Sequence, residues 1–582
     1  MPAGHPAAGA KPLAPLDRAG DAHPLRRWLL PVGVGALALL VGGLIYTRLL
    51  LPRGPLAWDE SVHALKGLVI AYDLAHGDGL SFLFNSYRQV LYPPIHSWFL
   101  ALAYLLAGPS VTTAATVTLL LYLLGAGLLY LAGGQLRPGA TNWAGAVAAL
   151  LWLTSPDLAG YAVQVMLEVP GLTALCLALL VQLKLLADDP DPREYMLLGA
   201  AIALTYLVRT PYGIILFLSV ALFLALEVRG RLWLLWNRRV FYLLLPLALV
   251  LAVWFAYPPK IAATWGWLVN YPDGVADPYS AEGWLFYPRA LVQIAGSPWL
   301  FALYLAAMVY ALVERRKGAL FLVTLVLVQA LIGEFHQNKQ ARYMFPVLPA
   351  WFLLAGNLLM GLGQRLAARR PSAVRWGMTL VGLLLVAQCA LLLRGTLDVA
   401  FANPPDGITA YVAETVAAAQ ATGQRTLVIG SMDMSYPSPP LLDWRLMVEH
   451  GLLAAPQAGS AAQIEEGRRL AALAARLPLP SPLAASLERV VTAYDRPAAL
   501  RTLYLGLPIR ASYSDPAQAP VFVGDLVQAQ TIDQVVVVSA PRPDARYPLS
   551  LLAPTLEAVG LRHIEGKPFA DVGMQVDVFR RE

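Results

Sequence analysis

The chain has 582 residues, of which 58% are hydrophobic and only 14% are charged, and this balance excludes an ordinary soluble globular protein. The formal net charge of +6 could suit a nucleic-acid binder, but the basic residues fall in short clusters between apolar runs, as in cytoplasmic loops. Cys176 and Cys389 both lie inside apolar runs, which excludes a disulfide framework and a cysteine-based metal site. The composition predicts a polytopic α-helical membrane protein.

The N-terminal segment is rich in Pro, Ala and Gly without apolar periodicity, so we expect residues 1–27 to form a disordered cytoplasmic tail. Arg26 and Arg27 precede an apolar run from Trp28 to Leu51, which is long enough to span a membrane. No small-residue cleavage pattern follows this run. A retained first span is therefore favoured over a removed signal peptide.

Further apolar runs predict a transmembrane domain over residues 28–394. Together with the first run they predict about eleven transmembrane helices by the hydropathy criterion. The runs lie near residues 111–134, 141–156, 169–186, 194–208, 212–228, 239–256, 297–314, 318–335, 344–362 and 375–393.

The run from Tyr92 to Ala107 is ambiguous, because it has only about sixteen residues and opens with two prolines. If this run does not span, the later basic clusters lie on the same side as Arg26 and Arg27, as the positive-inside rule requires. We therefore expect a helix that lies in or dips into the outer interface. The number of spans is then odd, and the C-terminus is extracytoplasmic.

Two large external loops follow from this orientation, at residues 52–110 and 257–296. The second loop is rich in aromatic side chains, which suit either an interfacial aromatic belt or a surface for stacking on sugars and prenyl chains. These aromatic residues are Trp265, Trp267, Tyr271, Tyr279, Trp284, Phe286 and Tyr287.

From about residue 395 the hydropathy collapses, and residues 395–582 are predicted to form a soluble extracytoplasmic α/β domain. This part holds no phosphate loop, nucleophile elbow or metal-ligand cluster, and Gly430-Ser431-Met432-Asp433 is interpreted as a turn after a strand. Helices are predicted at 408–421, 461–474 and 549–559, and strands at 426–429, 535–538 and 574–579.

Asp59 and Glu60 follow the first span directly, and an ionised carboxylate beside hydrocarbon must be solvated, paired or used. Glu168 stands at the head of a later span, in Met166-Leu167-Glu168-Val169-Pro170. Arg209 lies in Val208-Arg209-Thr210-Pro211, and a later external segment runs from Lys339 to Pro349 through Arg342 and Tyr343. Nearly all unusual polar residues are thus expected on one face of the membrane.

The order of these motifs, with Tyr92-Pro93-Pro94-Ile95-His96 closing the first external loop, resembles the GT-C glycosyltransferases. Within that group the chain is most similar to the protein O-mannosyltransferases and lipid A aminoarabinose transferases. The resemblance covers about residues 28–394, and its specificity lies in the order of the motifs. It implies transfer of a sugar from a polyprenyl-phosphate carrier to an acceptor at the outer face of the membrane.

The resemblance also implies roles for individual residues. Asp59 would take the proton from the attacking hydroxyl, Glu60 would order the loop or hold Asp59, and Glu168 would orient the acceptor or help to hold a cation. Basic side chains would bind the lipid phosphate as its charge develops. The expected phosphate-binding residues are Arg209, Lys339 and Arg342, and the expected substrate-loop residues are Tyr92, His96 and Tyr343.

Structural roles remain open for the same residues. The alternative role for the carboxylates is to cap helix N-termini, with no part in catalysis. The alternative for the basic residues is to reach lipid headgroups. For His96 a hydrogen-bonded structural role is favoured over ligation. His63 and His76 lie in the same loop, but their spacing matches no metal-ligand motif, so no metal site is predicted, and no cofactor is implied beyond a possible divalent cation.

The sequence as a whole predicts an inverting glycosyltransferase of the cell membrane that uses a polyprenyl-phosphate sugar and acts on a protein, lipid or cell-envelope glycan. One alternative is a transporter or flippase of lipid-linked saccharides, although charged mid-span residues and paired broken helices are not evident. The other is a membrane-anchored module that binds an envelope polymer through residues 395–582.

Overall fold

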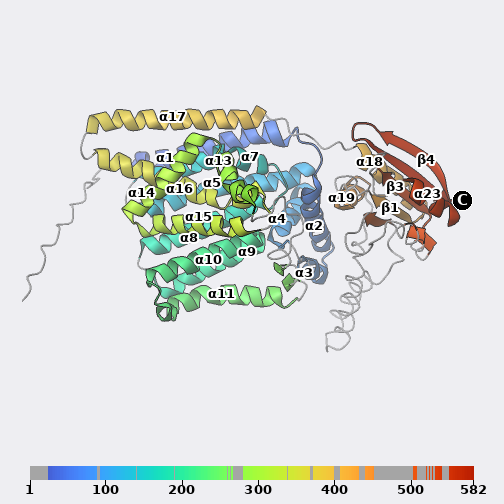
Figure 1. Ribbon diagram of the computed structural model, residues 1–582, viewed down its shortest axis with the longest axis horizontal. Coiled ribbons are helices and arrows are strands. Elements are labelled where there is room, and N and C mark those ends of the chain that lie inside the picture. The colour runs from blue at the N-terminus through green and yellow to red at the C-terminus, as the bar shows by residue number, and fades with distance from the viewer. Residues whose placement is uncertain are drawn as a thin grey trace, which may run out of the picture.

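The fold is described from a computed structural model of the chain, in which an α-helical bundle is joined to a small C-terminal α/β domain (Figure 1). The structure describes residues 24–87, 89, 92–138, 141–188, 190–257, 260–261, 264–265, 280–336, 338–367, 371–398, 407–430, 439–450, 502–506, 520, 523–524, 527–528, 531–539 and 549–582.

Eight helical segments of the described residues are long and apolar enough to cross a membrane, so the chain is a multi-pass membrane protein. The first segment, Trp28–Leu50, combines α1 with a short π-helix, η1. The long helices are α1 (Pro24–Ile45) with η1 (Tyr46–Leu50), α5 (Val111–Leu136), α8 (Glu168–Ala187), α10 (Thr210–Glu227), α11 (Arg238–Phe255), α15 (Lys317–Phe335), α16 (Val347–Ala367) and α17 (Pro371–Asp398).

The remaining helices of the bundle are shorter and pack between or beside the long ones. They are α2 (Trp58–Ala75), α3 (Gly79–Tyr87), α4 (Ile95–Ala107), α6 (Trp143–Thr154), α7 (Pro156–Tyr161), α9 (Tyr195–Val208), α13 (Ala281–Ile294) and α14 (Pro298–Glu314), with the 3-10 turns η2 (Pro192–Glu194), η3 (Leu232–Leu235) and η4 (Ala341–Met344).

Every apolar run of the sequence forms a helix, but three of the predicted spans are shorter than expected. The runs 141–156, 194–208 and 297–314 give α6 with 12 residues, α9 with 14 and α14 with 17. Helix α14 follows α13 at a bend of 103°, and the two together could form one broken span. The last long helix, α17, extends to Asp398 and so passes the domain boundary expected at residue 394.

Helix α4 forms within the ambiguous run, after Pro93 and Pro94. Its 13 residues extend about 20 Å at 1.5 Å per residue, which is less than the hydrocarbon core of a bilayer. The helix lies close against α2, because a Cβ on Gly67 would be only 2.5 Å from Leu100 Cβ. The length of α4 is thus compatible with the expected interfacial helix.

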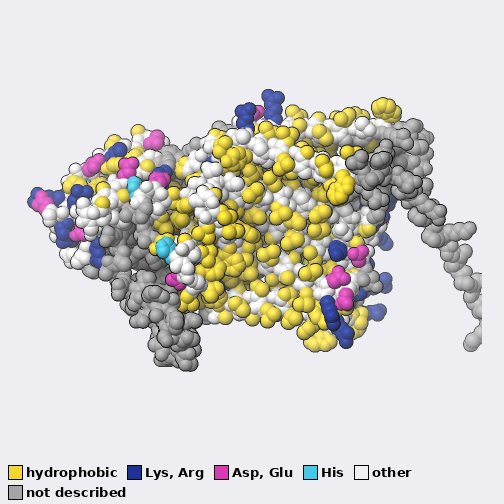
Figure 2. Space-filling model, turned by 180° about the vertical axis from the view of Figure 1, so that it is seen from behind, with side chains coloured by type: hydrophobic (Ala, Val, Ile, Leu, Met, Phe, Trp, Pro, Cys, Tyr) yellow, Lys and Arg dark blue, Asp and Glu magenta, His cyan; other side chains and the backbone are white. Residues whose placement is uncertain are grey.

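The bundle surface is hydrophobic over a broad band, as a lipid-facing surface requires. Figure 2 shows this band, with charged side chains gathered at the end of the bundle away from the C-terminal domain and on that domain itself. The candidate site described below lies at the opposite end, where α2 and α4 approach the C-terminal domain (Figure 1).

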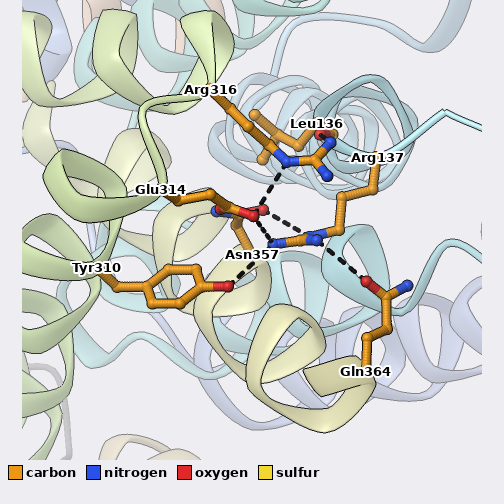
Figure 3. A network of polar contacts seen from close by, with 7 residues as sticks. All are labelled: Leu136, Arg137, Tyr310, Glu314, Arg316, Asn357 and Gln364. Atoms are coloured by element: carbon orange, nitrogen blue, oxygen red, sulfur yellow. Dashed lines mark hydrogen bonds and ion pairs between the residues drawn. The ribbon is translucent and has the colours of Figure 1, made fainter. Parts of the chain in front are cut away.

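A network around Arg137 joins three helices at the end of the bundle remote from the C-terminal domain (Figure 3). Arg137 follows α5, and its Nη2 donates to Glu314 Oε1 of α14 at 2.5 Å, while its Nε donates to Asn357 Oδ1 of α16 at 2.9 Å. Its Nη1 donates to Gln364 Oε1 at 3.0 Å, and Arg316 Nε donates to Glu314 at 3.0 Å. We call these residues the Arg137 clasp.

The C-terminal domain contains a five-stranded sheet in the order β2-β1-β3-β5-β4. The first three strands are parallel, and β5 runs antiparallel to β3 and β4. Helices α18 and α19 pack on one face and α23 on the other. The elements are α18 (Gly407–Ala421), β1 (Thr426–Gly430), α19 (Pro439–Glu449), β2 (Thr502–Gly506), β3 (Gln534–Ser539), α23 (Leu549–Ala558), β4 (Leu561–Phe569) and β5 (Met574–Arg581).

The three predicted strands correspond to β1, β3 and β5, and two of the predicted helices correspond to α18 and α23. Strands β2 and β4 and helix α19 were not predicted. The helix predicted at 461–474, the residues after Gly430 in the predicted turn, and residues 1–23 of the predicted tail lie outside the described residues.

Candidate active site

The first turn of α2 carries both carboxylates of the loop that follows the first span, which places them at a helix N-terminus, where negative charge is stabilised. The Asp59 side chain is partly exposed, at 27%, whereas Glu60 is buried. The two neighbours therefore have different environments and can serve different purposes.

Glu60 links the loop after the first span to the segment before α8. Its Oε1 accepts hydrogen bonds from Arg53 Nη2 at 2.8 Å and from the Val165 backbone N–H at 2.8 Å. Its Oε2 accepts from the Ala57 N–H at 2.7 Å, and Arg53 also donates to the Val163 carbonyl. These contacts tie the loop to the segment before α8, and the roles expected for Glu60, ordering the loop or holding Asp59, stay predictions.

Glu168 and Arg209 form a buried ion pair. Glu168 is fully buried in the first turn of α8, and its Oε1 accepts from Arg209 Nη2 at 2.8 Å. Arg209 lies at the junction of α9 and α10, and Gly171 allows close approach there, since a Cβ on Gly171 would be 2.8 Å from Arg209 Cβ. Glu168 Oε2 and Arg209 Nε have no hydrogen-bond partner among the described residues.

Arg342 joins the two acidic positions. Its Nη1 lies 3.6 Å from Asp59 Oδ2 and 3.6 Å from Glu168 Oε1, and its Nε donates to Gln340 Oε1 at 2.6 Å. Burial works to lower the pKa of Arg342, but Glu168 and the other neighbouring groups, Asp59 among them, outweigh burial and raise it. Residues from α2, α8, α9–α10 and η4 thus meet in one cluster of two carboxylates and two guanidinium groups.

Lys339 lies apart from this cluster in its contacts. Its buried Nζ donates to the Glu334 carbonyl at 2.8 Å and to Glu334 Oε1 at 3.2 Å, and lies 5.1 Å from the Tyr287 ring centroid. Tyr343 follows Arg342, whose guanidinium lies 5.8 Å from the Tyr343 ring centroid. Of the three predicted phosphate-binding residues, the structure joins Arg209 and Arg342 through Glu168 and pairs Lys339 with Glu334.

Two tyrosines of the cluster were missed by the sequence reasoning. The Tyr212 ring lies under the guanidinium of Arg209, and its centroid is 5.5 Å from Arg209 Cζ. Tyr161, at the end of α7, is close enough for Glu168 and Arg342 to influence it; burial first, then Glu168, raises the pKa of Tyr161 to about 12 despite the nearby arginines. Tyr212 stands at the start of an apolar run and Tyr161 between two of them, and neither carries a sequence signal that distinguishes it from an ordinary core aromatic residue.

A histidine layer packs between α2 and α4. His63 lies one turn after Asp59, with its ring 4.6 Å from that of Tyr92 and 6.0 Å from that of His96. Burial lowers the pKa of His96 to about 4, and burial together with His96 and Lys66 lowers the pKa of His63. The His96 ring nitrogens have no hydrogen-bond partner among the described residues, so the structural role expected for His96 stays a prediction.

No group of three or more His, Cys, Asp or Glu side chains that could hold a metal ion occurs within the described ranges. His76, the third histidine of the loop, is at the end of α2, and its Nδ1 lies 2.8 Å from the Tyr72 carbonyl oxygen. Of the aromatic loop, Trp267, Tyr271 and Tyr279 lie outside the described residues, and Trp284 and Tyr287 lie on α13.

Residues 92–257 match the family model of dolichyl-phosphate-mannose-protein mannosyltransferases. This segment contains Glu168 and Arg209 of the cluster, together with Tyr92 and His96. No curated protein matches the chain.

Solved structures match nearly the whole chain. ArnT from Cupriavidus metallidurans bound to undecaprenyl phosphate is 17% identical, with 94% of this chain and 97% of that chain covered and a TM-score of 0.50. The chain has the GT-C glycosyltransferase fold. This finding confirms the resemblance that the order of the motifs indicated.

Two further GT-C structures agree with this fold. The oligosaccharyltransferase AglB from Archaeoglobus fulgidus, in complex with an inhibitory peptide and a dolichol-phosphate, is 13% identical over 88% of this chain and 70% of that chain, with a TM-score of 0.52. The arabinofuranosyltransferase AftD from Mycobacteria is 18% identical over 95% of this chain and 40% of that chain, with a TM-score of 0.53. At these identities the likeness concerns the fold.

Proposed function

We propose that the chain is an inverting glycosyltransferase that moves a sugar from a polyprenyl-phosphate carrier to an acceptor hydroxyl at the outer face of the membrane. The observation that carries this proposal is the bridge from Arg342 to both Asp59 and Glu168, at 3.6 Å in each case. It supplies a partly exposed carboxylate beside two cationic groups, of which Arg209 is buried and Arg342 is partly exposed. The match to mannosyltransferases and the fold of polyprenyl-phosphate-binding relatives support the same reaction.

Asp59 is the proposed general base. The acceptor oxygen attacks the anomeric carbon of the sugar and gives its proton to the Asp59 carboxylate, while the bond between that carbon and the phosphate oxygen breaks. Attack opposite to the leaving phosphate inverts the anomeric centre. The carboxylate can reach a substrate because it is partly exposed, unlike that of Glu60.

Arg342 and Arg209 are the proposed phosphate-binding residues. The leaving phosphate gains negative charge as the bond breaks, and guanidinium groups bind phosphate oxygens through paired N–H donors. Arg209 has an Nε without a hydrogen-bond partner in the described part of the chain. Lys339 would contribute only after its pair with Glu334 opens, and Glu168 holds the two arginines in place.

The predicted orientation, with a cytoplasmic N-terminus and an extracytoplasmic C-terminal domain, belongs to this proposal. The candidate site and the C-terminal domain lie at the same end of the bundle, where α19 contacts α2 (Figure 1). An acceptor would therefore reach Asp59 from the side that carries this domain.

The test is transfer by purified protein in liposomes, with polyprenyl-phosphate mannose and polyprenyl-phosphate arabinofuranose as donors and release of polyprenyl phosphate as the readout. Asp59→Asn keeps the shape of the side chain but removes the base, so we expect at least a hundredfold lower release, in the range typical of a lost general base. Mass spectrometry of lipid extracted from the purified protein identifies the carrier independently.

Asp73→Asn is the matched control. Asp73 lies in the last turns of the same helix and accepts from Asn85 Nδ2 at 2.7 Å, away from the cluster, so this variant should retain transfer. Full activity of Asp59→Asn would contradict the catalytic assignment. Movement of the intact lipid-linked sugar across the bilayer, without release of polyprenyl phosphate, would instead support a flippase.

A further inference from the structure

A large apolar cavity lies in the half of the bundle remote from the candidate site. It measures about 810 Å³ and lies among α1, α6, α16 and α17. Most of its lining comes from the first halves of α1, α6 and α17 and from the second half of α16. Cavities of this size hold whole small-molecule ligands in other proteins. The cavity is separate from Asp59 and its partners, and the proposed reaction does not use it.

The cavity exists because α17, which touches α6, α7 and α16, packs less closely against them than these helices pack against one another. Helices α6 and α16 touch closely, since a Cβ on Gly356 would lie 2.2 Å from the Ala144 carbonyl oxygen. By contrast only 6% of the apolar window of α17 is buried, and Figure 1 shows this helix along the edge of the bundle. A Cβ on Gly33 or Gly382, which both line the cavity, would meet no atom within 4 Å. The cavity is therefore a groove open to the surrounding lipid.

Exposed tryptophans mark the level of the groove in the membrane. Trp28 of α1, Trp143 of α6 and Trp376 of α17 are exposed at or near the ends of their helices, and tryptophan collects at the boundary between hydrocarbon and water. The lining begins at this level, with Trp143 itself, and continues toward the bilayer centre through Gly33 and Gly382. An occupant would therefore have its apolar part in the groove and its polar end at the interface.

The same ends of these helices are basic. Arg26 and Arg27 lie in the first turn of α1, Arg365 in the last turn of α16, and Arg375 near the start of α17, whereas no Asp or Glu lies in the lining halves of the four helices. Gln364 lines the groove and accepts a hydrogen bond from Arg137 of the clasp. Basic positions beside an apolar groove at an interface complement an anionic lipid headgroup.

We propose that this groove is a binding site for an anionic phospholipid of the leaflet remote from the candidate site. An acyl chain fills the groove between α17 and the bundle, and the phosphate lies at the arginine-rich helix ends. The lipid would pack α17 against α1, α6 and α16, where side-chain contact is sparse. This site is independent of the proposed transfer reaction.

Native mass spectrometry of the protein, purified in mild detergent and exchanged into nanodiscs of equal phosphatidylglycerol and phosphatidylcholine, tests the proposal. We expect bound phosphatidylglycerol at a stoichiometry near one, enriched at least threefold over phosphatidylcholine. The double variant Gly33→Phe and Gly382→Phe places two large side chains in the groove from positions where an added Cβ meets no atom within 4 Å, and it should lower the bound lipid at least tenfold.

Gly35→Phe is the matched control, because Gly35 is also exposed and has no atom within 4 Å of a Cβ, but does not line the groove. It should leave the bound lipid unchanged. A photoactivatable phosphatidylglycerol, used with the unaltered protein, should label peptides of α1 or α17 even if the double variant folds poorly.

Three results would overturn the proposal. The first is that the groove-filling variant retains as much phosphatidylglycerol as Gly35→Phe. The second is that the extracted lipid is a polyprenyl phosphate or phosphatidylcholine. The third is that a second copy of the chain covers the groove, seen as a dimer that the double variant dissociates.

Discussion

At the scale of single residues, Glu168 and Asp59 share Arg342 but differ in burial, and we expect them to differ in their contribution to stability. Glu168→Ala removes one partner of a buried pair and leaves Arg209 without its carboxylate, which costs about 3–5 kcal/mol for such pairs. Asp59→Ala breaks only a partly exposed contact at 3.6 Å and should cost about 1 kcal/mol or less. The midpoints of thermal unfolding in detergent compare the two, and equal shifts would contradict the assignment of Glu168 as the buried anchor.

His96 predicts a dependence of stability on pH. Its pKa is about 4 in the folded protein because of burial, and an unfolded histidine titrates near 6.5. Between these values the unfolded state binds more protons than the folded state, so His96 destabilises the protein as the pH falls from about 6.5 to 4. The loss is on the order of 3 kcal/mol at the acidic end.

Thermal unfolding of the unaltered protein and of His96→Asn, measured at intervals from pH 7 to pH 4, isolates this contribution. The variant has no titrating group at this position, so the difference between the two midpoints should change steadily across the range. A difference that is constant with pH would show that His96 does not titrate as its burial implies.

The candidate cluster was partly predictable, because its acidic and basic residues stand out at the ends of apolar runs. Asp59, Glu168, Arg209 and Arg342 were all named from the order of motifs. The pairing of Lys339 with Glu334 was not, because spacing along a loop does not fix the direction in which a side chain points.

Tertiary contacts explain the other omissions at this scale. The sequence predicted no role for Arg53, because one of its partners, the Val163 carbonyl, is more than a hundred residues away. Its other partner is Glu60. Tyr212 on α10 and Tyr161 on the short helix α7 resemble any other aromatic residues of the chain until the bundle is assembled.

At the scale of elements, the Arg137 clasp should determine how firmly α5, α14 and α16 pack. Arg137→Ala removes donors to Glu314, Asn357 and Gln364 in a largely buried site, and we expect a loss of about 3–5 kcal/mol. Arg394→Ala is the control, because the Arg394–Asp398 pair of α17 is mostly exposed and should contribute nothing measurable. Thermal unfolding of both variants provides the comparison, and similar midpoints would exclude a structural role for the clasp.

The elements themselves were predictable to the extent that a periodic or continuous apolar pattern marked them. All apolar runs became helices, the strands β1 and β3 are short runs of mostly branched apolar residues, and β5 alternates Val576 and Val578 with polar residues. Strand β4 was missed because it is mostly exposed and carries Arg562, His563, Glu565 and Lys567, so the alternation of a half-buried strand is absent. The antiparallel pairing of β4 with β5 stabilises the strand, although its own sequence has no strand pattern.

At the scale of the whole molecule, the C-terminal domain is docked on the bundle through α19. Leu441 and Trp444 belong to the same hydrophobic core as the membrane helices, and the Trp444 ring lies 5.7 Å from that of Tyr104 in α4. Trp444→Ala should weaken this docking by about 3–5 kcal/mol, as expected for truncation of a buried tryptophan.

Limited proteolysis in nanodiscs measures the docking. We expect trypsin to release C-terminal fragments from Trp444→Ala at least ten times faster than from the unaltered protein, with Trp376→Ala as a control for an exposed tryptophan of α17. Identical rates in all three proteins would show that α19 does not hold the domain in place.

The position of Arg342 has a kinetic consequence for the proposed reaction. While its guanidinium lies beside both carboxylates, the Asp59 carboxylate is held in an ion-pair contact at 3.6 Å and is not free to meet an acceptor hydroxyl. A donor phosphate that draws Arg342 toward itself would release Asp59 at the moment when a sugar is in place. Substrate binding should then be ordered, with the lipid-linked donor first and the acceptor second.

Initial-rate measurements with both substrates varied, and with polyprenyl phosphate as a product inhibitor, would reveal this order. Inhibition by polyprenyl phosphate should be competitive with the donor and not with the acceptor. Hydrolysis of the donor by water should also be slow but measurable without any acceptor, because the base is already released once the donor has bound.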